Sequence, residues 1–164
     1  MRYDLREVMV NPGFRLPFRT ELETENLDFP SVKEYLRPPV AEGEFYNEAG
    51  ILHMQGTITA EMRCICDRCG QEFDSVKVTD VDTVLLEEES EENPDCFVLE
   101  GTELNAQEVL SACLILDMET KFLCREDCRG LCARCGRNLN LGPCGCGKEI
   151  DPRFAVLEQL LDKS

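Results

Sequence analysis

Residues 52–62 read Leu-His-Met-Gln-Gly-Thr-Ile-Thr-Ala-Glu-Met, and this stretch decides the fold class. Its apolar and polar side chains alternate, which is the period of a β-strand with one buried face. The residues on that face are Leu52, Met54, Gly56, Ile58, Ala60 and Met62. A turn at residues 48–50 can join this strand to a strand around residues 44–46, and the Val- and Thr-rich residues 73–86 predict a third. We therefore expect a meander of long antiparallel strands that packs on one face.

Two local patterns refine the predicted sheet. Apolar and polar residues also alternate over residues 14–22, but Pro17 cannot donate a ladder hydrogen bond, so this strand is expected at an edge or a bulge. In the third long strand the apolar alternation changes phase between Phe73 and Val76, which predicts a β-bulge there.

Two helices are expected downstream of the strands. Asn105 is the expected N-cap of the first, and Glu108 completes a capping-box pattern. Asp151 and Pro152 are typical of the start of the second. The apolar face expected on the first helix consists of Val109, Leu110, Cys113, Leu114 and Leu116. The predicted fold class is α+β: an antiparallel sheet packed by helices, with a small C-terminal segment that resembles a zinc knuckle.

The net charge of −16 is unevenly distributed along the 164 residues. Residues 1–120 carry 9 basic and 27 acidic side chains, whereas residues 121–164 carry 8 basic and 6 acidic ones. Charge and cysteine density change at the same point, which predicts an acidic α+β domain over 1–120 and a cysteine-rich metal-binding segment with a C-terminal helix over 121–164.

The composition also bears on the class of protein. No apolar run approaches the ~20 residues that a membrane span needs, and the first residues lack the apolar stretch of a secretory signal, so we expect neither a membrane protein nor a secreted one. The acidic total argues against nucleic-acid binding by bulk charge, because phosphates would be repelled. The acidic half suits a basic protein partner instead.

Six of the eleven cysteines lie within a 23-residue stretch: Cys124, Cys128, Cys132, Cys135, Cys144 and Cys146. Clustered thiols in a reducing compartment more often bind a metal than form disulfides. The run Cys132-Ala-Arg-Cys135-Gly136 has the spacing of a zinc knuckle, in which two intervening residues turn both thiolates toward one ion. We expect four of the six thiols to bind structural zinc, and Cys132 and Cys135 are the clearest candidates; an iron–sulfur site or redox thiols are the alternatives.

A second pair repeats the knuckle spacing at Cys66-Asp-Arg-Cys69-Gly70, at the tip of the hairpin expected between the second and third strands. Cys66 and Cys69 could form half of a second four-thiolate site, complete the C-terminal site across the fold, act as redox thiols or bind nothing. The spacing alone leaves these alternatives open.

The sequence gives little support for catalysis or for a small-molecule substrate. His53 is the only histidine, and its strand parity places it on the polar face. No phosphate loop, nucleophile elbow or dinucleotide fingerprint is present, so we name no catalytic residue. The basic side chains near the cysteines are candidates for local contact with nucleic-acid phosphates or for neutralising the thiolates. They are Arg125, Arg129, Arg134 and Arg137.

The order of these motifs resembles the YceD family, bacterial and plastid proteins linked to the accumulation of large-subunit ribosomal RNA. The resemblance rests on the Cys66–Cys69 pair after a strand, on the 104–110 helix start, on the run from Leu123 to Asn140, and on Asp151-Pro152-Arg153. Many members of that family lack the C-terminal cysteines, which implies that a metal there is a structural addition.

The resemblance implies a cytoplasmic, non-enzymatic accessory factor in ribosome biogenesis that supports synthesis, processing or stability of large-subunit (23S) rRNA. Its implied partners are a ribosomal protein or a pre-ribosomal particle. Two other hypotheses remain: a thiol-disulfide oxidoreductase that uses Cys66 and Cys69, and a generic interaction module stabilised by zinc.

Overall fold

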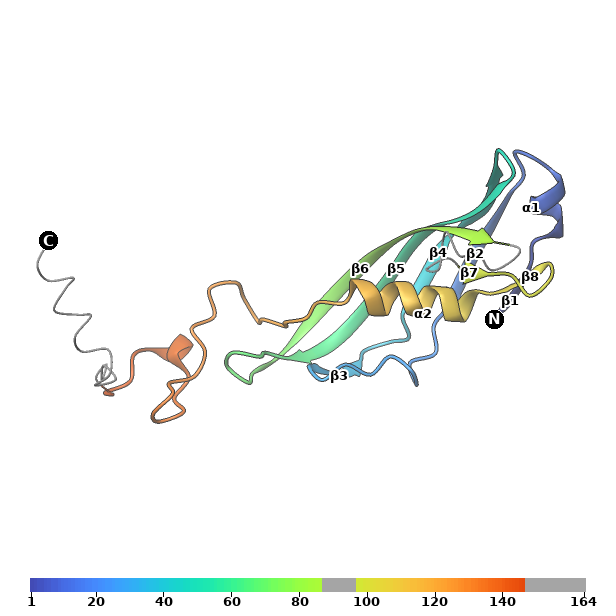
Figure 1. Ribbon diagram of the computed structural model, residues 1–164. Helices are drawn as coiled ribbons and strands as arrows, with labels where there is room; N and C mark the ends of the chain where they lie inside the picture. Colours follow the sequence, from blue (N-terminus) through green and yellow to red (C-terminus); the bar gives the residue numbers. More distant parts are fainter. Residues whose placement is uncertain (87–96, 147–164) are drawn as a thin grey trace, which may run out of the picture.

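The computed structural model describes residues 1–86 and 97–146 of the chain. The described part combines strands with two α-helices and one 3-10 helix (Figure 1). In chain order the elements are β1 (Arg2–Asp4), α1 (Arg6–Val10), β2 (Arg15–Glu21), β3 (Val32–Tyr35), β4 (Val40–Glu48), β5 (Ile51–Ile65), β6 (Glu72–Leu86), β7 (Phe97–Val98), β8 (Glu103–Asn105), α2 (Ala106–Asp117) and η1 (Leu139–Leu141). The acidic run after Leu86 and the helix expected from Asp151 lie outside the described residues.

The large sheet has the strand order β2-β4-β5-β6-β7, and β3 also pairs with β5. The expected long antiparallel strands are present: β4 pairs with β5, and β5 pairs with β6 in unbroken register from Leu52↔Leu85 to Ile65↔Glu72. β2, which contains Pro17, lies at an edge as predicted. The meander is only partial, because β3 and β4 follow one another along the same side of β5 and β7 runs parallel to β6.

The bulge expected near Phe73 is wrong. β6 keeps one register along its whole pairing with β5, so the phase change reflects which side chains are exposed. Phe73 lies on the inner face and is half-buried, whereas Val76 and Val78 lie on the outer face and are 63% and 56% exposed. A regular strand thus presents two valines to solvent.

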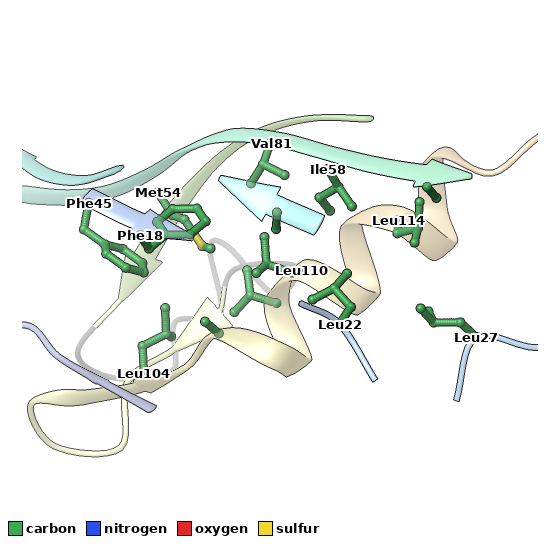
Figure 2. Packing of buried hydrophobic residues seen from close by; sticks show 14 of the residues in the cluster. Phe18, Leu22, Leu27, Phe45, Met54, Ile58, Val81, Leu104, Leu110 and Leu114 are labelled. Carbon is green, nitrogen blue, oxygen red and sulfur yellow. The ribbon is translucent and has the colours of Figure 1, made fainter. Parts of the chain in front are cut away.

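Helix α2 packs against the inner face of the sheet, where most of the core lies (Figure 2). Leu110 and Leu114 of the helix face Ile58 and Val81 of the sheet, and all four side chains are buried. Leu116, expected on the same face, is 84% exposed, because it lies about 200° around the helix from Leu114.

The start of α2 is also fixed by the N-terminus of the chain. β1 pairs with β8 in a small separate sheet, and the N–H of Ala106 donates to the carbonyl oxygen of Met1 at 3.0 Å. Asn105 is the N-cap residue as expected, but its side chain donates to Glu108 Oε1 (2.7 Å) and caps no helix N–H. The prediction of a capping box is therefore wrong, because the Asn105 and Glu108 side chains bond to each other and the Asn105 side chain caps no backbone N–H.

Candidate metal centres

The first knuckle closes the hairpin between β5 and β6. The N–H of Cys66 donates to Gln71 O (2.9 Å), and the N–H of Gly70 donates back to Cys66 O (2.8 Å). Gly70 has φ +68°, a left-handed conformation that glycine adopts without strain. This tight turn holds Cys66 and Cys69 side by side at the end of the longest hairpin of the sheet, where both are buried.

The structure brings Cys124 and Cys128 onto this knuckle and so forms a group of four thiols, which we call tetrad A. Cys66 Sγ lies 3.8 Å from Cys128 Sγ, and Cys69 Sγ lies 3.7 Å from Cys124 Sγ. All four sulfur atoms lie within 4.8 Å of one another. Four sulfurs placed ~2.3 Å from a tetrahedral zinc ion would lie ~3.8 Å apart, so tetrad A fits the size and chemistry of a zinc site.

Asp67, inside the first knuckle, attaches the C-terminal segment to the hairpin. Its N–H donates to Phe122 O (2.9 Å), and its carboxylate accepts from the N–H of Phe122 (2.6 Å) and from Ser31 Oγ (2.6 Å). Because these hydrogen bonds favour the ionised form, first from Ser31 and then from Phe122, the pKa of Asp67 is lowered. The same residue thus fixes the chain immediately before Cys124.

Arg68 makes the corresponding contacts on the other side of tetrad A. Its Nη1 donates to Cys128 O (3.0 Å) and to Glu126 O (3.3 Å), and its carbonyl oxygen accepts from the N–H of Leu131 (3.1 Å). Gly130 passes so close that a Cβ atom there would lie 2.9 Å from Arg68 O. The loop from Glu126 to Leu131 is therefore packed directly on the knuckle backbone.

Two of the four thiols of tetrad A, Cys66 and Cys128, are shifted toward the thiolate, the form that binds metal. Burial raises the pKa of Cys66, but N–H groups of Cys124, Cys69 and Arg68 outweigh it and lower that pKa to about 6. The amide of Asn140 donates to Cys128 Sγ at 3.2 Å and lowers the pKa of Cys128. Burial raises the pKa of Cys69, and it raises that of Cys124 to about 12.

The remaining four C-terminal thiols form a second group, tetrad B: Cys132, Cys135, Cys144 and Cys146. Its knuckle repeats the first one, because the N–H of Gly136 donates to Cys132 O at 2.8 Å and Gly136 has φ +69°. N–H groups of Cys135 and Arg134 lower the pKa of Cys132 to about 6, and the neighbouring Cys135 raises that of Cys146 to about 12. Tetrad B also meets the distance criterion of a four-thiolate site, but Cys135 is exposed and the other three are only partly buried.

The six C-terminal cysteines are thus divided between the two groups. Cys124 and Cys128 join Cys66 and Cys69, whereas the other four form a separate group, which is the two-site arrangement among the alternatives considered above. Cys64 and Cys113 belong to neither group: Cys64 is buried in β5, and Cys113 is half-buried in α2.

The four arginines proposed for phosphate contact are all exposed: Arg125, Arg129, Arg134 and Arg137. Arg125 forms an ion pair with Asp127 (3.4 Å). His53 lies on the outer face of the sheet, where its ring stacks on Tyr46 with centroids 4.9 Å apart.

Sequence reasoning missed Asp67, Arg68 and Asn140 as site residues. The two knuckle residues could have been found from their place between the paired cysteines. Asn140 carries no such signal, because its contact with Cys128 depends on how the chain turns after the second knuckle.

Fold and site together define a class: a β-sheet protein with two cysteine tetrads that can bind metal, one of which joins the C-terminal segment to a hairpin tip. The chain belongs to the YceD family, since the family model described as "Large ribosomal RNA subunit accumulation protein YceD" matches residues 54–161, more than half of the sequence. No curated protein and no solved structure matched the chain. Among the described residues, no helix has the length and apolar character to cross a membrane.

Proposed function

We propose that this protein is a non-enzymatic accessory factor in ribosome biogenesis that supports synthesis, processing or stability of 23S rRNA in the cytoplasm. The observation that carries the proposal is the family match over residues 54–161, which includes the β5–β6 hairpin and all eight cysteines of the two tetrads. Membership in a family linked to accumulation of the large-subunit RNA supports a role in that process.

Both tetrads are proposed to hold structural zinc, with Cys66, Cys69, Cys124 and Cys128 at one site and Cys132, Cys135, Cys144 and Cys146 at the other. Zinc favours four thiolates in a tetrahedron, and the repeated knuckle geometry supplies two at each site. When bound, the ion would cross-link segments that have few apolar contacts of their own, so residues 121–164 would be a metal-ordered unit. Elemental analysis of purified protein should give two zinc ions per chain, and iron would contradict the assignment.

Two partners are proposed, one for each charge region. Residues 125–137 carry four exposed arginines and are the candidate for a local rRNA contact. The acidic first 120 residues suit a basic ribosomal protein, because opposite charges favour association.

The proposal is tested by depleting the protein and measuring the ratio of 23S to 16S rRNA, which should fall and recover when the wild-type chain is restored. Binding of purified 23S fragments across a salt series should weaken when Arg125, Arg129 and Arg137 are replaced by Gln. A matched control replaces Arg2, Arg19 and Arg37, which lie in the acidic half, and should leave RNA binding unchanged. An unaltered rRNA ratio on depletion would contradict the proposed function.

A thiol-disulfide oxidoreductase is the second candidate, and the lowered pKa of Cys66 is the observation that favours it. A redox thiol must also be accessible to its substrate, whereas Cys66 and Cys69 are 1% and 5% exposed. Cys66→Ser and Cys69→Ser distinguish the two proposals: loss of zinc supports the metal site, and full zinc content with loss of disulfide exchange supports the oxidoreductase.

A further inference from the structure

The two borders of the large sheet differ in how they are protected against pairing with another chain. β2 contains Pro17, and its outward arginines are paired with glutamates of β4 (Arg15 with Glu44, Arg19 with Glu42). Proline and charged pairs are common devices that keep an edge strand from adding further strands.

β6 has no proline, and much of its length is unpaired on one side. Residues 72–85 pair with β5, but on the opposite side only Leu85 and Leu86 are paired, with β7. Within the described part of the chain, residues 72–84 thus form an open edge. An open edge offers a row of main-chain N–H and C=O groups to an incoming strand.

The outer face of this edge is apolar in one half and acidic in the other. Val76 and Val78 are more than half exposed, and Asp80 and Asp82 follow on the same face. Both aspartates are exposed, and no described residue forms an ion pair with either of them. These unpaired acids give the edge a preference for basic side chains.

On the inner face, the start of β6 adjoins a hollow of about 240 Å³. Phe73, Phe122 and Leu123 give it apolar walls. Its charged lining is mixed, with Lys121, Glu126 and Glu119, and Glu119 forms an ion pair with Lys77. An added strand would turn every second side chain toward this face. An apolar residue of that strand could occupy the hollow.

We propose that the open edge of β6 binds an extended, lysine- or arginine-rich segment of a partner protein, which joins the sheet as an additional strand. Main-chain hydrogen bonds supply the attachment, and alternate side chains supply the selectivity. Basic side chains on the outer face lie beside Asp80 and Asp82, whereas apolar ones lie beside Val76 and Val78. The proposal deepens, and rests on, the basic-partner part of the proposed function, for which it names the surface and the binding mode.

The experiment uses the full chain and a defined probe: a 12-residue acetylated and amidated peptide in which lysine alternates with valine. Its controls are the same peptide with glutamate in place of lysine, and one with N-methylated alternate residues, which removes hydrogen bonds along one strand edge. Titration should show binding of the lysine peptide alone. Amide hydrogen exchange should then slow at those N–H groups of residues 72–84 that do not bond to β5.

Charge-reversed variants test whether the acids of β6 are responsible. Asp80→Lys combined with Asp82→Lys should weaken binding about tenfold, since two favourable ion pairs become repulsive. Glu21→Lys combined with Glu23→Lys makes the same change in net charge at the opposite border and should weaken binding about twofold or less.

Besides failure of the lysine peptide to bind, four outcomes would overturn the proposal. They are equal loss of binding in both double variants, equal binding of the N-methylated peptide, protection in the free monomer of the β6 amides that do not bond to β5, and a dimer in light scattering in which those same amides are already protected. The third would mean that the chain covers its own edge, and the fourth that a second copy does. Failure with the peptide, when ribosomal proteins still bind, would reject this edge and leave the proposed function standing.

Discussion

Tetrads A and B each consist of four cysteine sulfur atoms, and each includes one Cys-x-x-Cys knuckle, yet their surroundings differ. In tetrad A three of the four thiols are buried, and Phe73 and Leu123 pack against them. Tetrad B lies farther along the chain, beyond the sheet (Figure 1), and Cys135 is exposed. From Leu131 to Cys146, all of which the structure describes, no residue is buried.

This difference separates two roles for the same chemistry. Around tetrad A, hydrogen bonds from Asp67 and Arg68 already join the C-terminal segment to the hairpin, so a metal would reinforce an existing contact. Around tetrad B there is little apolar surface to bury, so a metal would supply most of the ordering free energy. We expect tetrad A to attach the segment and tetrad B to fold it.

The largest expected effect comes from removing metal with a chelator. The segment around tetrad B should unfold locally, because it loses several kcal/mol of binding free energy and has no core to replace it. The sheet should persist, since its core lies between α2 and the strands. Limited proteolysis should cut residues 131–146 first, and amide exchange should report continued protection in β5. Simultaneous loss of protection in residues 131–146 and in β5 would show that the sheet also depends on the metal.

Single cysteine variants sharpen the comparison. Cys128→Ser and Cys132→Ser each remove one ligand from the same short segment, so both should lower the zinc content. Cys128→Ser should also release the segment from the hairpin, lowering local stability there by about 3 kcal/mol, whereas Cys132→Ser should change it by less than about 0.5 kcal/mol. The measurement is exchange of the Asp67 N–H, which is bonded to Phe122 O. Similar exchange rates in the two variants would contradict separate roles.

The sheet was predictable because its signals are local. Alternation over residues 52–62 predicts β5 and its buried face, and Pro17 predicts an edge position for β2. The same reasoning failed at Val76, because periodicity shows which residues share a face and does not show that an apolar face is buried.

The division of the thiols could not be predicted, because it depends on contacts between distant parts of the chain. The C-terminal segment offers six cysteines for the four ligand positions of one tetrahedral site, so local geometry leaves the choice open. The hydrogen bonds between Asp67 and Phe122, 55 residues apart, bring Cys124 to the first knuckle. Local sequence patterns do not predict a contact between residues so far apart in the chain.

A smaller effect is expected at Asn140, which connects the two sites. It lies between the ligands of tetrad B, but its side-chain amide donates to Cys128 of tetrad A and its oxygen accepts from the N–H of Arg129 (2.8 Å). Asn140→Ala should weaken metal binding at tetrad A by about 10–100-fold, the usual effect of losing an outer hydrogen bond to a ligand. The measurement is competition with a chelator, with each site followed by cadmium-113 resonance.

The control for Asn140 is Leu141→Ala, which changes the exposed neighbour and should leave both affinities unchanged. A loss confined to tetrad B in Asn140→Ala would mean that the residue only orders its own loop. Equal losses of metal affinity in Asn140→Ala and Leu141→Ala would also contradict the proposed connection between the two sites.

The smallest expected effect distinguishes the two glycines on either side of the second knuckle. Gly130 and Gly136 have φ of +72° and +69°, so replacement by alanine imposes a similar backbone strain of about 1–2 kcal/mol at each. Only at Gly130 would the new Cβ meet another part of the chain, at 2.9 Å from Arg68 O, whereas nothing lies within 4 Å of that position at Gly136. Gly130→Ala should therefore cost about 1 kcal/mol more than Gly136→Ala, as chemical denaturation of the segment followed by amide exchange would measure. Because the backbone strain cancels in the comparison, the difference in stability between the two variants measures the packing of the loop on the first knuckle. Equal losses of stability would mean that this packing does not help to hold the segment on the sheet.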